Sequence, residues 1–472
     1  MKTLKTTLSL CVGLICMILT LSVSANAATT IVAVSASARL ANAGTVTYTA
    51  TLAGIPASDD GMVYLYALQP YEYAISAADP CVGTAPLSLT PTFSFGLNGM
   101  ICNKFALAVK IGGVPVMIAN AQYITNPEVA ATRTRAPQNV GFVEPYEKMV
   151  LYRIGEVDPN LCAIGNYSTA VIVNKANPNL INPYALVGDK HPVSPKMYYA
   201  LNAANATGVQ TLQSTMSNFA AVSHVDEFII GNEVNNRKWN YMAYMDWDSY
   251  IREYAQAFRV AYNAIKSTNA NARVLISLDQ NWDRNRPTSH GEYYEYLDVS
   301  DFLIKFNAFV CMEGNIDWGL AAHPYPTPLT YAKFWDYSGC PNGAYYQRMI
   351  ATNAQISFQN LPVLTSFMQQ PGMLSPNGGV RYIILPEIGL TSAQGYEVQA
   401  AAYVACYTAC RNNPCIKRIY FHRMNEGGAL NFGTAGISEQ VYQSLIAGGP
   451  GQYDAWAKSY IGIADWHQVV SY

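Results

Sequence analysis

The feature that most constrains the fold is a repeat of βα units that begins at about residue 137. From there, short apolar runs alternate with longer stretches of helical periodicity, which is the pattern of a parallel sheet covered by helices. Many of the apolar runs end in polar residues, and the carboxyl ends of the strands form the active face of a (β/α)₈ barrel. The sequence therefore predicts an α/β protein with a TIM-type (β/α)₈ barrel over residues 137–472. Strands are expected at 168–173, 226–230, 273–278, 319–322, 381–385 and 416–421, and helices at 207–221, 250–265, 398–411 and 453–470.

The first half of this barrel is short in the sequence. Only about 30 residues separate residue 137 from the strand at 168–173, whereas two βα units need roughly 60 residues. We expect residues 137–167 to form at most one complete βα unit, which leaves the sheet with an unpaired edge. An exposed edge favours pairing with another chain, so a homo-oligomer is a predicted consequence.

A different pattern precedes the barrel. Runs rich in β-branched and aromatic residues lie at 45–52, 62–68 and 105–111, and Gly, Pro and Asp residues separate them. Such runs are typical of short strands joined by turns. The sequence predicts a small β-sandwich domain over residues 28–130, followed by a linker.

The amino terminus has the features of a secretory signal peptide. Lys2 and Lys5 form a positive region, residues 8–24 carry no charge, and Ala25–Ala27 is a small-x-small cleavage site. We expect residues 1–27 to be removed and the protein to be secreted, outside the cell or into a periplasm. A membrane anchor is the alternative. No other segment approaches ~20 apolar residues, so no integral membrane segment is expected after cleavage.

Eight of the ten cysteines lie after the expected cleavage site. An oxidising compartment favours disulfides, and eight cysteines allow 105 pairings. Cys81 with Cys102, and Cys311 with Cys340, are the candidate local pairs. No Cys-x-x-Cys or His/Cys cluster has the spacing of a zinc site, so no metal is expected.

The charge balance excludes a basic surface for nucleic acid. The whole chain carries −2, and removal of Lys2 and Lys5 leaves 27 basic against 31 acidic residues, or −4. Nucleic-acid binding therefore has no electrostatic support. Only 13% of residues are charged, about half the usual ~25%. The 34 tyrosines and many uncharged polar residues suit a carbohydrate surface, although well-packed strands would explain them equally well.

Two glutamates carry the strongest chemical signal. Glu233 follows the apolar run Phe228–Ile230, and Glu387 follows Tyr382–Leu385 in the same way. A carboxylate at the end of a buried strand is costly unless it is paired or used. A barrel can bring both side chains together at the face formed by the carboxyl ends of its strands. Glycoside hydrolysis requires such a pair of facing carboxyl groups. A capped or salt-bridged residue is the structural alternative for either glutamate alone.

These strand ends resemble strands four and seven of the clan A retaining glycoside hydrolases. The resemblance implies that Glu233 is the acid/base, that Asn232 binds the sugar 2-hydroxyl and that Glu387 is the nucleophile. His323-Pro324-Tyr325 resembles the strand-six His-x-Tyr motif, whose Tyr hydrogen-bonds the nucleophile. A larger set of motifs looks like one functionally unassigned family of secreted bacterial clan A-like barrels: Gly231–Asn235 with Trp239, Ser277–Trp282, Asp317–Gly319, His323–Pro326 and Phe421–Arg423.

The remaining substrate-binding candidates each have a packing alternative. His323 and Tyr325 stand at a strand end beside two prolines, which favours the pocket. Asp279 and Trp282 close the strand at 273–278, and Trp282 could either floor a sugar subsite or pack in the core.

Two more candidates follow strand ends. Trp239, six residues after Glu233, is a candidate platform for a sugar ring. His422 and Arg423 end the last strand, where many clan members place a Trp, so the floor of the central subsite departs from the clan pattern.

Together these observations predict a secreted retaining β-glycoside hydrolase that acts on a polysaccharide or oligosaccharide with two glutamates and no cofactor. The rival is a non-catalytic carbohydrate-binding or surface protein on a degenerate barrel. The compressed first half favours the rival, and retention of both Glu233 and Glu387 favours the enzyme.

Overall fold

A computed structural model provides the coordinates for this chain. The predicted signal peptide 1–27, Trp239 and Arg423 lie outside the residues that it describes. The described residues are 35–36, 45–96, 99–124, 126–131, 142–144, 149–150, 169–172, 203–221, 225–236, 246–284, 296–422 and 430–472.

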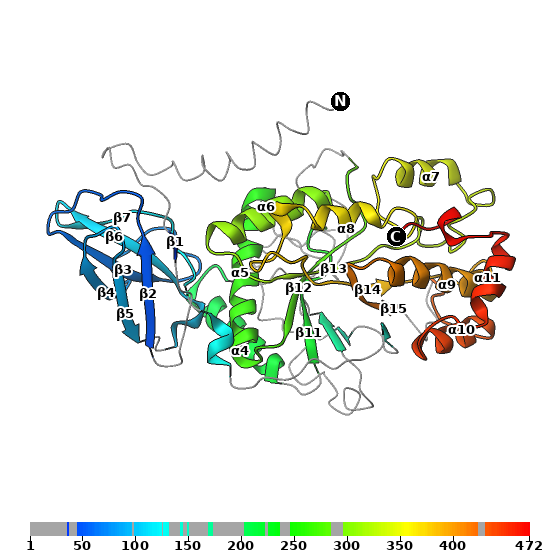
Figure 1. The fold of residues 1–472 in the computed structure, drawn as a ribbon, viewed down its shortest axis with the longest axis horizontal. Coiled ribbons are helices and arrows are strands. Elements are labelled where there is room, and N and C mark those ends of the chain that lie inside the picture. Colours follow the sequence, from blue (N-terminus) through cyan, green and yellow to red (C-terminus); the bar gives the residue numbers. More distant parts are fainter. Residues whose placement is uncertain are drawn as a thin grey trace.

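Two antiparallel sheets form the amino-terminal part of the molecule (blue in Figure 1). The first sheet has the order β1 (Ser35–Ala36), β2 (Thr45–Thr51) and β5 (Thr92–Gly96). The second has the order β4 (Cys81–Pro86), β3 (Met62–Leu68), β6 (Lys104–Ile111) and β7 (Val114–Met117).

The inward faces of these two sheets share one core. Along β2, buried Val46, Tyr48 and Ala50 alternate with more exposed threonines, as expected for a strand that is buried on one face. Phe95 of the first sheet packs against Phe105 of the second, with 5.2 Å between ring centroids. The predicted strands at 45–52, 62–68 and 105–111 are therefore confirmed.

The second part of the chain is built on one sheet in which every pair of neighbouring strands is parallel. Its strand order is β8 (Val143–Glu144), β15 (Ile416–Phe421), β14 (Ile383–Ile388), β13 (Gly319–Ala322), β12 (Arg273–Leu278), β11 (Val225–Ile230), β10 (Thr169–Ile172) and β9 (Met149–Val150).

Helices alternate with these strands (Figure 1). Among the described residues they are α4 (Ala206–Ala221), α5 (Trp247–Thr268), α6 (Val299–Met312), α7 (Gly343–Ala351), α8 (Pro362–Met368), α9 (Tyr396–Asn412), α10 (Ile437–Ile446) and α11 (Tyr453–Ile461).

The side chains of this sheet divide into two separate cores. One small cluster takes a single residue from each of five consecutive strands, β11 to β15: Ile229, Leu275, Ala321, Ile384 and Tyr420. The residues on either side of Ile229 belong instead to the large core that includes the helices. Alternate residues thus face a closed interior and an outer ring of helices, which is the construction of a (β/α) barrel. The predicted fold class is confirmed.

The two outermost members of the sheet come from one short segment. β8 pairs with β15, β9 pairs with β10, and only residues 145–148 separate the two strands in the chain. A βαβ crossover needs at least about 10 residues, so four residues are too few for one, which agrees with the prediction of at most one complete βα unit in residues 137–167. β8 and β9 form the two ends of the strand order, and the unpaired edge that we expected stays a prediction.

Several boundaries differ from the sequence prediction, and two of the differences have a clear local reason or bear on the site. The expected helix at 453–470 ends at Ile461, because Gly462 takes a left-handed conformation at φ 84°, a common helix stop. A short 3₁₀ turn, η4 (Trp466–Gln468), follows. The strand expected at 381–385 is β14, which starts two residues later and contains Glu387 rather than ending before it.

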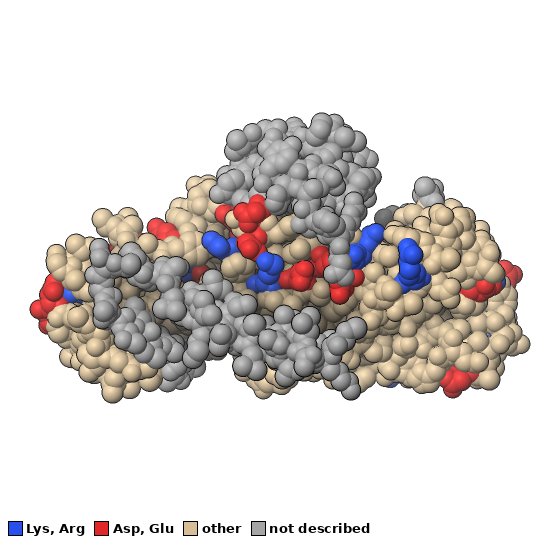
Figure 2. All heavy atoms as spheres, turned by 90° about the horizontal axis from the view of Figure 1, so that it is seen from above, with Lys and Arg blue, Asp and Glu red and all other residues tan. Residues whose placement is uncertain are grey.

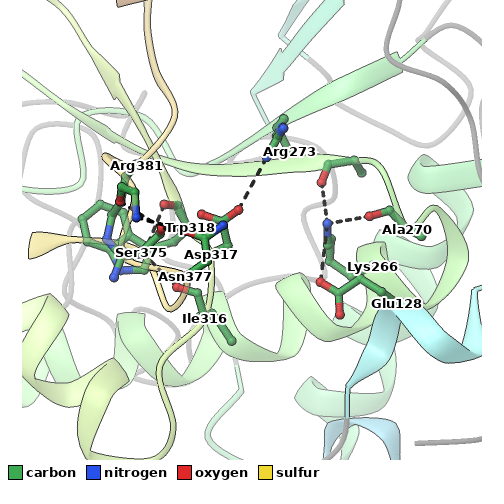
Figure 3. A network of polar contacts seen from close by, with 12 residues as sticks. Glu128, Lys266, Ala270, Arg273, Ile316, Asp317, Trp318, Ser375, Asn377 and Arg381 are labelled. Atoms are coloured by element: carbon green, nitrogen blue, oxygen red, sulfur yellow. Dashed lines mark hydrogen bonds and ion pairs between the residues drawn. The ribbon is translucent and has the colours of Figure 1, made fainter. Parts of the chain in front are cut away.

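Polar contacts fix the amino ends of the central strands (Figure 3). Arg273, the first residue of β12, lies 3.5 Å from Asp317, which precedes β13. Arg381, just before β14, is fully buried and donates to the Ile316 carbonyl at 2.7 Å. Lys266 of α5 contacts Glu128, at the end of the amino-terminal part, at 3.5 Å. This end of a barrel is associated with stability, which leaves the opposite end for chemistry.

The predicted disulfide pairs are wrong. None of the seven cysteines that the structure describes forms a disulfide. The thiol of Cys102 is buried and lies 3.7 Å from the Val260 carbonyl, whereas Cys81 is exposed on β4 and contacts Gly83. Cys311 contacts Asn307 and Cys340 contacts Pro341. Spacing along the chain carried no information on whether the Cβ atoms approach, which a disulfide requires.

Among the described residues, the structure contains no helix that is both long enough and apolar enough to cross a membrane.

Candidate active site

The acid/base candidate stands on a sharply turned loop after β11. Gly231 has φ 82° and Glu233 has φ 46°, a left-handed backbone that is uncommon for a residue with a Cβ. Two tyrosine hydroxyls of α5 hold the loop: Tyr254 donates to the Ile230 carbonyl at 2.5 Å and Tyr250 to the Val234 carbonyl at 2.6 Å. The strain at Glu233 is therefore fixed by its surroundings, as is common at functional sites.

Glu233, His323 and Glu387 meet at the carboxyl ends of β11, β13 and β14. The Nδ1 atom of His323 lies 3.0 Å from Oε1 of Glu233 and 2.9 Å from Oε2 of Glu387. One oxygen from each carboxyl group and the imidazole nitrogen all lie within 4.8 Å of one another. The side chain of His323 is fully buried, whereas those of Glu233 and Glu387 are 14% and 15% exposed. A reacting group can therefore reach both carboxyl groups but not the imidazole.

Ser277, near the end of β12, links this group to the backbone of the acid/base loop. Its hydroxyl oxygen accepts the backbone N–H of Glu233 at 3.1 Å and lies 3.2 Å from Nε2 of His323. Its carbonyl accepts the N–H of Val234 at 2.9 Å. Side chain and main chain of Ser277 thus hold consecutive residues of the loop.

Asp279 is held by amides from two loops. Its carboxylate accepts hydrogen bonds from the Asn235 side chain at 2.9 Å and from the Asn281 backbone and side chain at 2.8 and 2.7 Å. Burial, and secondarily the charge of Glu233, raise the pKa of Asp279 to about 6, while these donors oppose the rise. With its oxygens so occupied, Asp279 mainly ties the loop after β11 to the end of β12.

An aromatic group lies beside the nucleophile candidate. The ring of Tyr325 stacks on Phe432, with 6.2 Å between centroids, and His422 meets Phe432 edge-on at 5.8 Å. Nε2 of His422 lies 3.8 Å from Oε1 of Glu387. A Cβ on Gly389 would come within 2.8 Å of the rings of Phe432 and Tyr325. Only glycine therefore lets these two rings pack this close to β14.

The other predicted site residues have mixed outcomes. Asn232 is partly buried on the same loop as Glu233. Trp282 is only 6% exposed and packs edge-on against Phe367, with 5.1 Å between centroids, which favours the packing alternative over a sugar platform. Trp239 and Arg423 lie outside the described residues.

Glu233, His323 and Glu387 could in principle ligate one metal ion, since each offers an atom within 4.8 Å of the others. The same distances suit an imidazole N–H between two carboxyl groups, because N–H···O hydrogen bonds measure about 2.7–3.2 Å. His and carboxylate ligands accept many divalent metals, so the donor set alone specifies no particular ion.

Sequence reasoning missed Ser277, Asn235 and Phe432. Ser277 did carry a signal, because a hydroxyl inside the apolar run of β12 must find partners when it is buried. Asn235 is also fully buried and stands two residues after the acid/base candidate. No sequence feature near Phe432 predicted its contact with Tyr325.

The sequence of this region decides the family. Residues 160–469 match the model described as a family of unknown function, DUF5722. The chain belongs to DUF5722. The match covers the barrel from residue 160 and does not include the amino-terminal sheets. No curated protein matches the chain.

Several solved structures resemble this DUF5722 member. A family 39 glycoside hydrolase from the gut symbiont Bacteroides cellulosilyticus WH2 has a TM-score of 0.39 at 12% identity, over 88% of this chain and 82% of that one. A GH128 endo-β-1,3-glucanase from Sorangium cellulosum has a TM-score of 0.34 at 14% identity, over 64% and 97%. The Ignisphaera aggregans GH53 catalytic domain has a TM-score of 0.33 at 11% identity, over 66% of this chain and 77% of that one. Because these scores lie below 0.5, the case for function rests on the site geometry.

Proposed function

We propose that this DUF5722 member is a retaining β-glycoside hydrolase with Glu387 as nucleophile and Glu233 as acid/base. The observation that carries the proposal is the approach of the two carboxyl groups, with one oxygen of each within 4.8 Å of the other. Retaining enzymes hold the groups about 5–5.5 Å apart, whereas inverting enzymes leave about 6.5–9.5 Å for a water molecule. The arrangement thus supports double displacement.

In the first step the Glu387 carboxylate attacks the anomeric carbon. The glycosidic C–O bond breaks, and Glu233 transfers its proton to the departing oxygen. The products are a glycosyl ester on Glu387 and a Glu233 carboxylate. Glu387 can make this attack because its side chain is partly exposed and its strand fixes it opposite Glu233.

In the second step Glu233 accepts a proton from water, and the water oxygen attacks the anomeric carbon. The ester bond breaks and Glu387 leaves as a carboxylate, which restores the resting state. The fixed loop geometry of Glu233 serves both steps, since the leaving oxygen and the incoming water occupy the same position.

A carbohydrate is the substrate class that the surface favours. Only 13% of the residues are charged, and most of the described surface in Figure 2 is neither basic nor acidic. A neutral poly- or oligosaccharide fits such a surface better than a polyanion. We further propose that the enzyme acts after export, which the signal-peptide pattern of residues 1–27 supports.

Leaving-group dependence tests the two roles. Glu387→Gln should abolish hydrolysis of β-linked polysaccharides and of dinitrophenyl β-glycosides alike, because no ester can form. Glu233→Ala should slow polysaccharide hydrolysis about 10²–10⁴-fold, the usual contribution of a general acid. It should spare the first step on dinitrophenyl glycosides, whose leaving group needs no proton.

Glu439→Gln is the matched control, because Glu439 is an exposed glutamate on α10 away from the site. It should leave every rate unchanged. Equal loss on both substrate types for Glu233→Ala contradicts its role as acid/base. Binding of polysaccharide without hydrolysis of any β-glycoside would favour the carbohydrate-binding protein instead.

A further inference from the structure

Ser277 and His323 have contacts that double displacement alone does not require. The hydroxyl of Ser277 touches the backbone N–H of Glu233 and the Nε2 atom of His323, and the other ring nitrogen of His323 touches both glutamates. Ser277 and His323 are both fully buried. A buried polar chain of this kind has only a few proton arrangements in which every contact is a hydrogen bond.

The contacts of Ser277 select one of these arrangements. A hydroxyl can donate one hydrogen bond and accept two. Its oxygen already accepts the N–H of Glu233, and among the described residues its other polar side-chain contact is Nε2 of His323. The hydroxyl proton therefore goes to Nε2, which must then be the unprotonated nitrogen of a neutral ring.

The contacts of Nδ1 agree with this arrangement. A neutral imidazole with a bare Nε2 carries its proton on Nδ1. There the N–H points between Oε1 of Glu233 and Oε2 of Glu387, at 3.0 and 2.9 Å. An unprotonated Nδ1 would instead place a lone pair against two carboxyl groups that share at most one proton in the resting enzyme.

We propose that Ser277 is a positioning residue that locks His323 as the Nδ1–H tautomer, so that one N–H serves the two glutamates in turn. In the resting state the N–H donates to the Glu387 carboxylate. Once Glu387 is esterified and Glu233 has given up its proton, the negative charge lies on Glu233 and the N–H donates there. His323 keeps its proton throughout. The consequence for catalysis rests on the proposed function, whereas the tautomer does not.

Nitrogen-15 NMR of histidine-labelled protein measures the tautomer directly without a substrate. The His323 signals are assigned by their loss in His323→Gln. We expect a protonated Nδ1 and a bare Nε2 at pH 7 in the wild type, and a mixture of tautomers or the Nε2–H form in Ser277→Ala. Ser438→Ala is the matched control, since Ser438 is a fully buried hydroxyl on α10, and it should leave the His323 signals unchanged.

Kinetics supply the second readout. Ser277→Ala should lower kcat about tenfold or more on an activated aryl glycoside, for which breakdown of the ester limits the rate, and should shift the pH profile of that step. Ser277→Thr keeps the hydroxyl and should restore the wild-type tautomer and most of kcat. If Ser277→Ala does not fold, the wild-type spectrum alone decides the matter.

An Nε2–H ring or a doubly protonated ring in the wild type overturns the inference, as does a Ser277→Ala variant with an unchanged tautomer. The two proposals fail separately. A locked Nδ1–H tautomer in a protein that hydrolyses no glycoside supports the arrangement and removes the hydrolase. An active glycoside hydrolase with an Nε2–H ring supports the proposed function and removes the proposed tautomer.

Discussion

At the scale of single residues, the charges in the site depend on one another. Asp279 is buried beside Glu233, and burial together with that charge raises its pKa to about 6, above the ordinary value of 3.8. The folded protein therefore binds a proton at Asp279 more readily than the unfolded chain does between these pH values. The stability contributed by this proton is present at low pH and is lost as the pH rises through about 6.

This linkage predicts a difference between the wild type and Asp279→Asn. The free energy of unfolding of the wild type should fall, relative to that of the variant, as the pH rises from about 4 to about 7, because only the wild type releases this proton. Denaturant unfolding at a series of pH values measures the difference. Parallel pH curves for wild type and Asp279→Asn would show that Asp279 does not titrate in this range.

At the scale of elements, the sequence predicted strands better than it predicted their ends. The apolar runs of β11 to β13 and β15 are buried where periodicity placed them, because burial and pattern agree there. β14 begins two residues later than expected, and the side chain of Arg381, just before it, is held by contacts outside the ladder. The guanidinium of Arg381 bonds to the carbonyls of Met373 and Ile316, and local sequence does not reveal such distant partners.

The candidate site followed the same rule. Glu233, Glu387 and His323 were predictable, since polar residues at the ends of parallel strands meet at one edge. The packing of Trp282 could not be predicted, because its partner Phe367 lies 85 positions away in the sequence. Nor did spacing reveal that Cys311 and Cys340 would contact other residues instead of each other.

Arg381 should be one of the most costly residues of the barrel to replace. It is fully buried, stacks on Trp318 with 4.1 Å to the ring centroid and donates to several carbonyl oxygens, while burial lowers its pKa to about 10. Arg381→Met should lower the free energy of unfolding by about 3–5 kcal/mol, because it leaves those acceptors unpaired. Arg273→Met is the control: its side chain is 44% exposed, so the loss should stay near 0–1 kcal/mol. Denaturant unfolding compares the two, and equal losses would contradict this view of the network.

At the scale of the whole molecule, the shortened barrel does not leave the site incomplete. β8 and β9 occupy the two outer positions of the sheet, and pairing with a second copy at this edge stays a prediction. Glu233, His323 and Glu387 come from the ends of β11, β13 and β14, and none of these strands pairs with β8 or β9. The amino-terminal sheets contact the helical side of the barrel, where buried Lys104 pairs with Glu313 at 2.7 Å.

Covalent trapping of the nucleophile tests the central claim most directly. A cyclophellitol-type epoxide with β-glycoside configuration reacts only where a carboxylate can attack its anomeric position and an acid can protonate the departing oxygen. Intact-mass analysis after incubation of the protein with a series of such probes should show one added label, and peptide mapping should place it on Glu387. Glu387→Gln should take up none, and Glu439→Gln should be labelled as the wild type is. A label on another residue, or inverted product anomers by NMR on a substrate that the protein hydrolyses, would contradict the account.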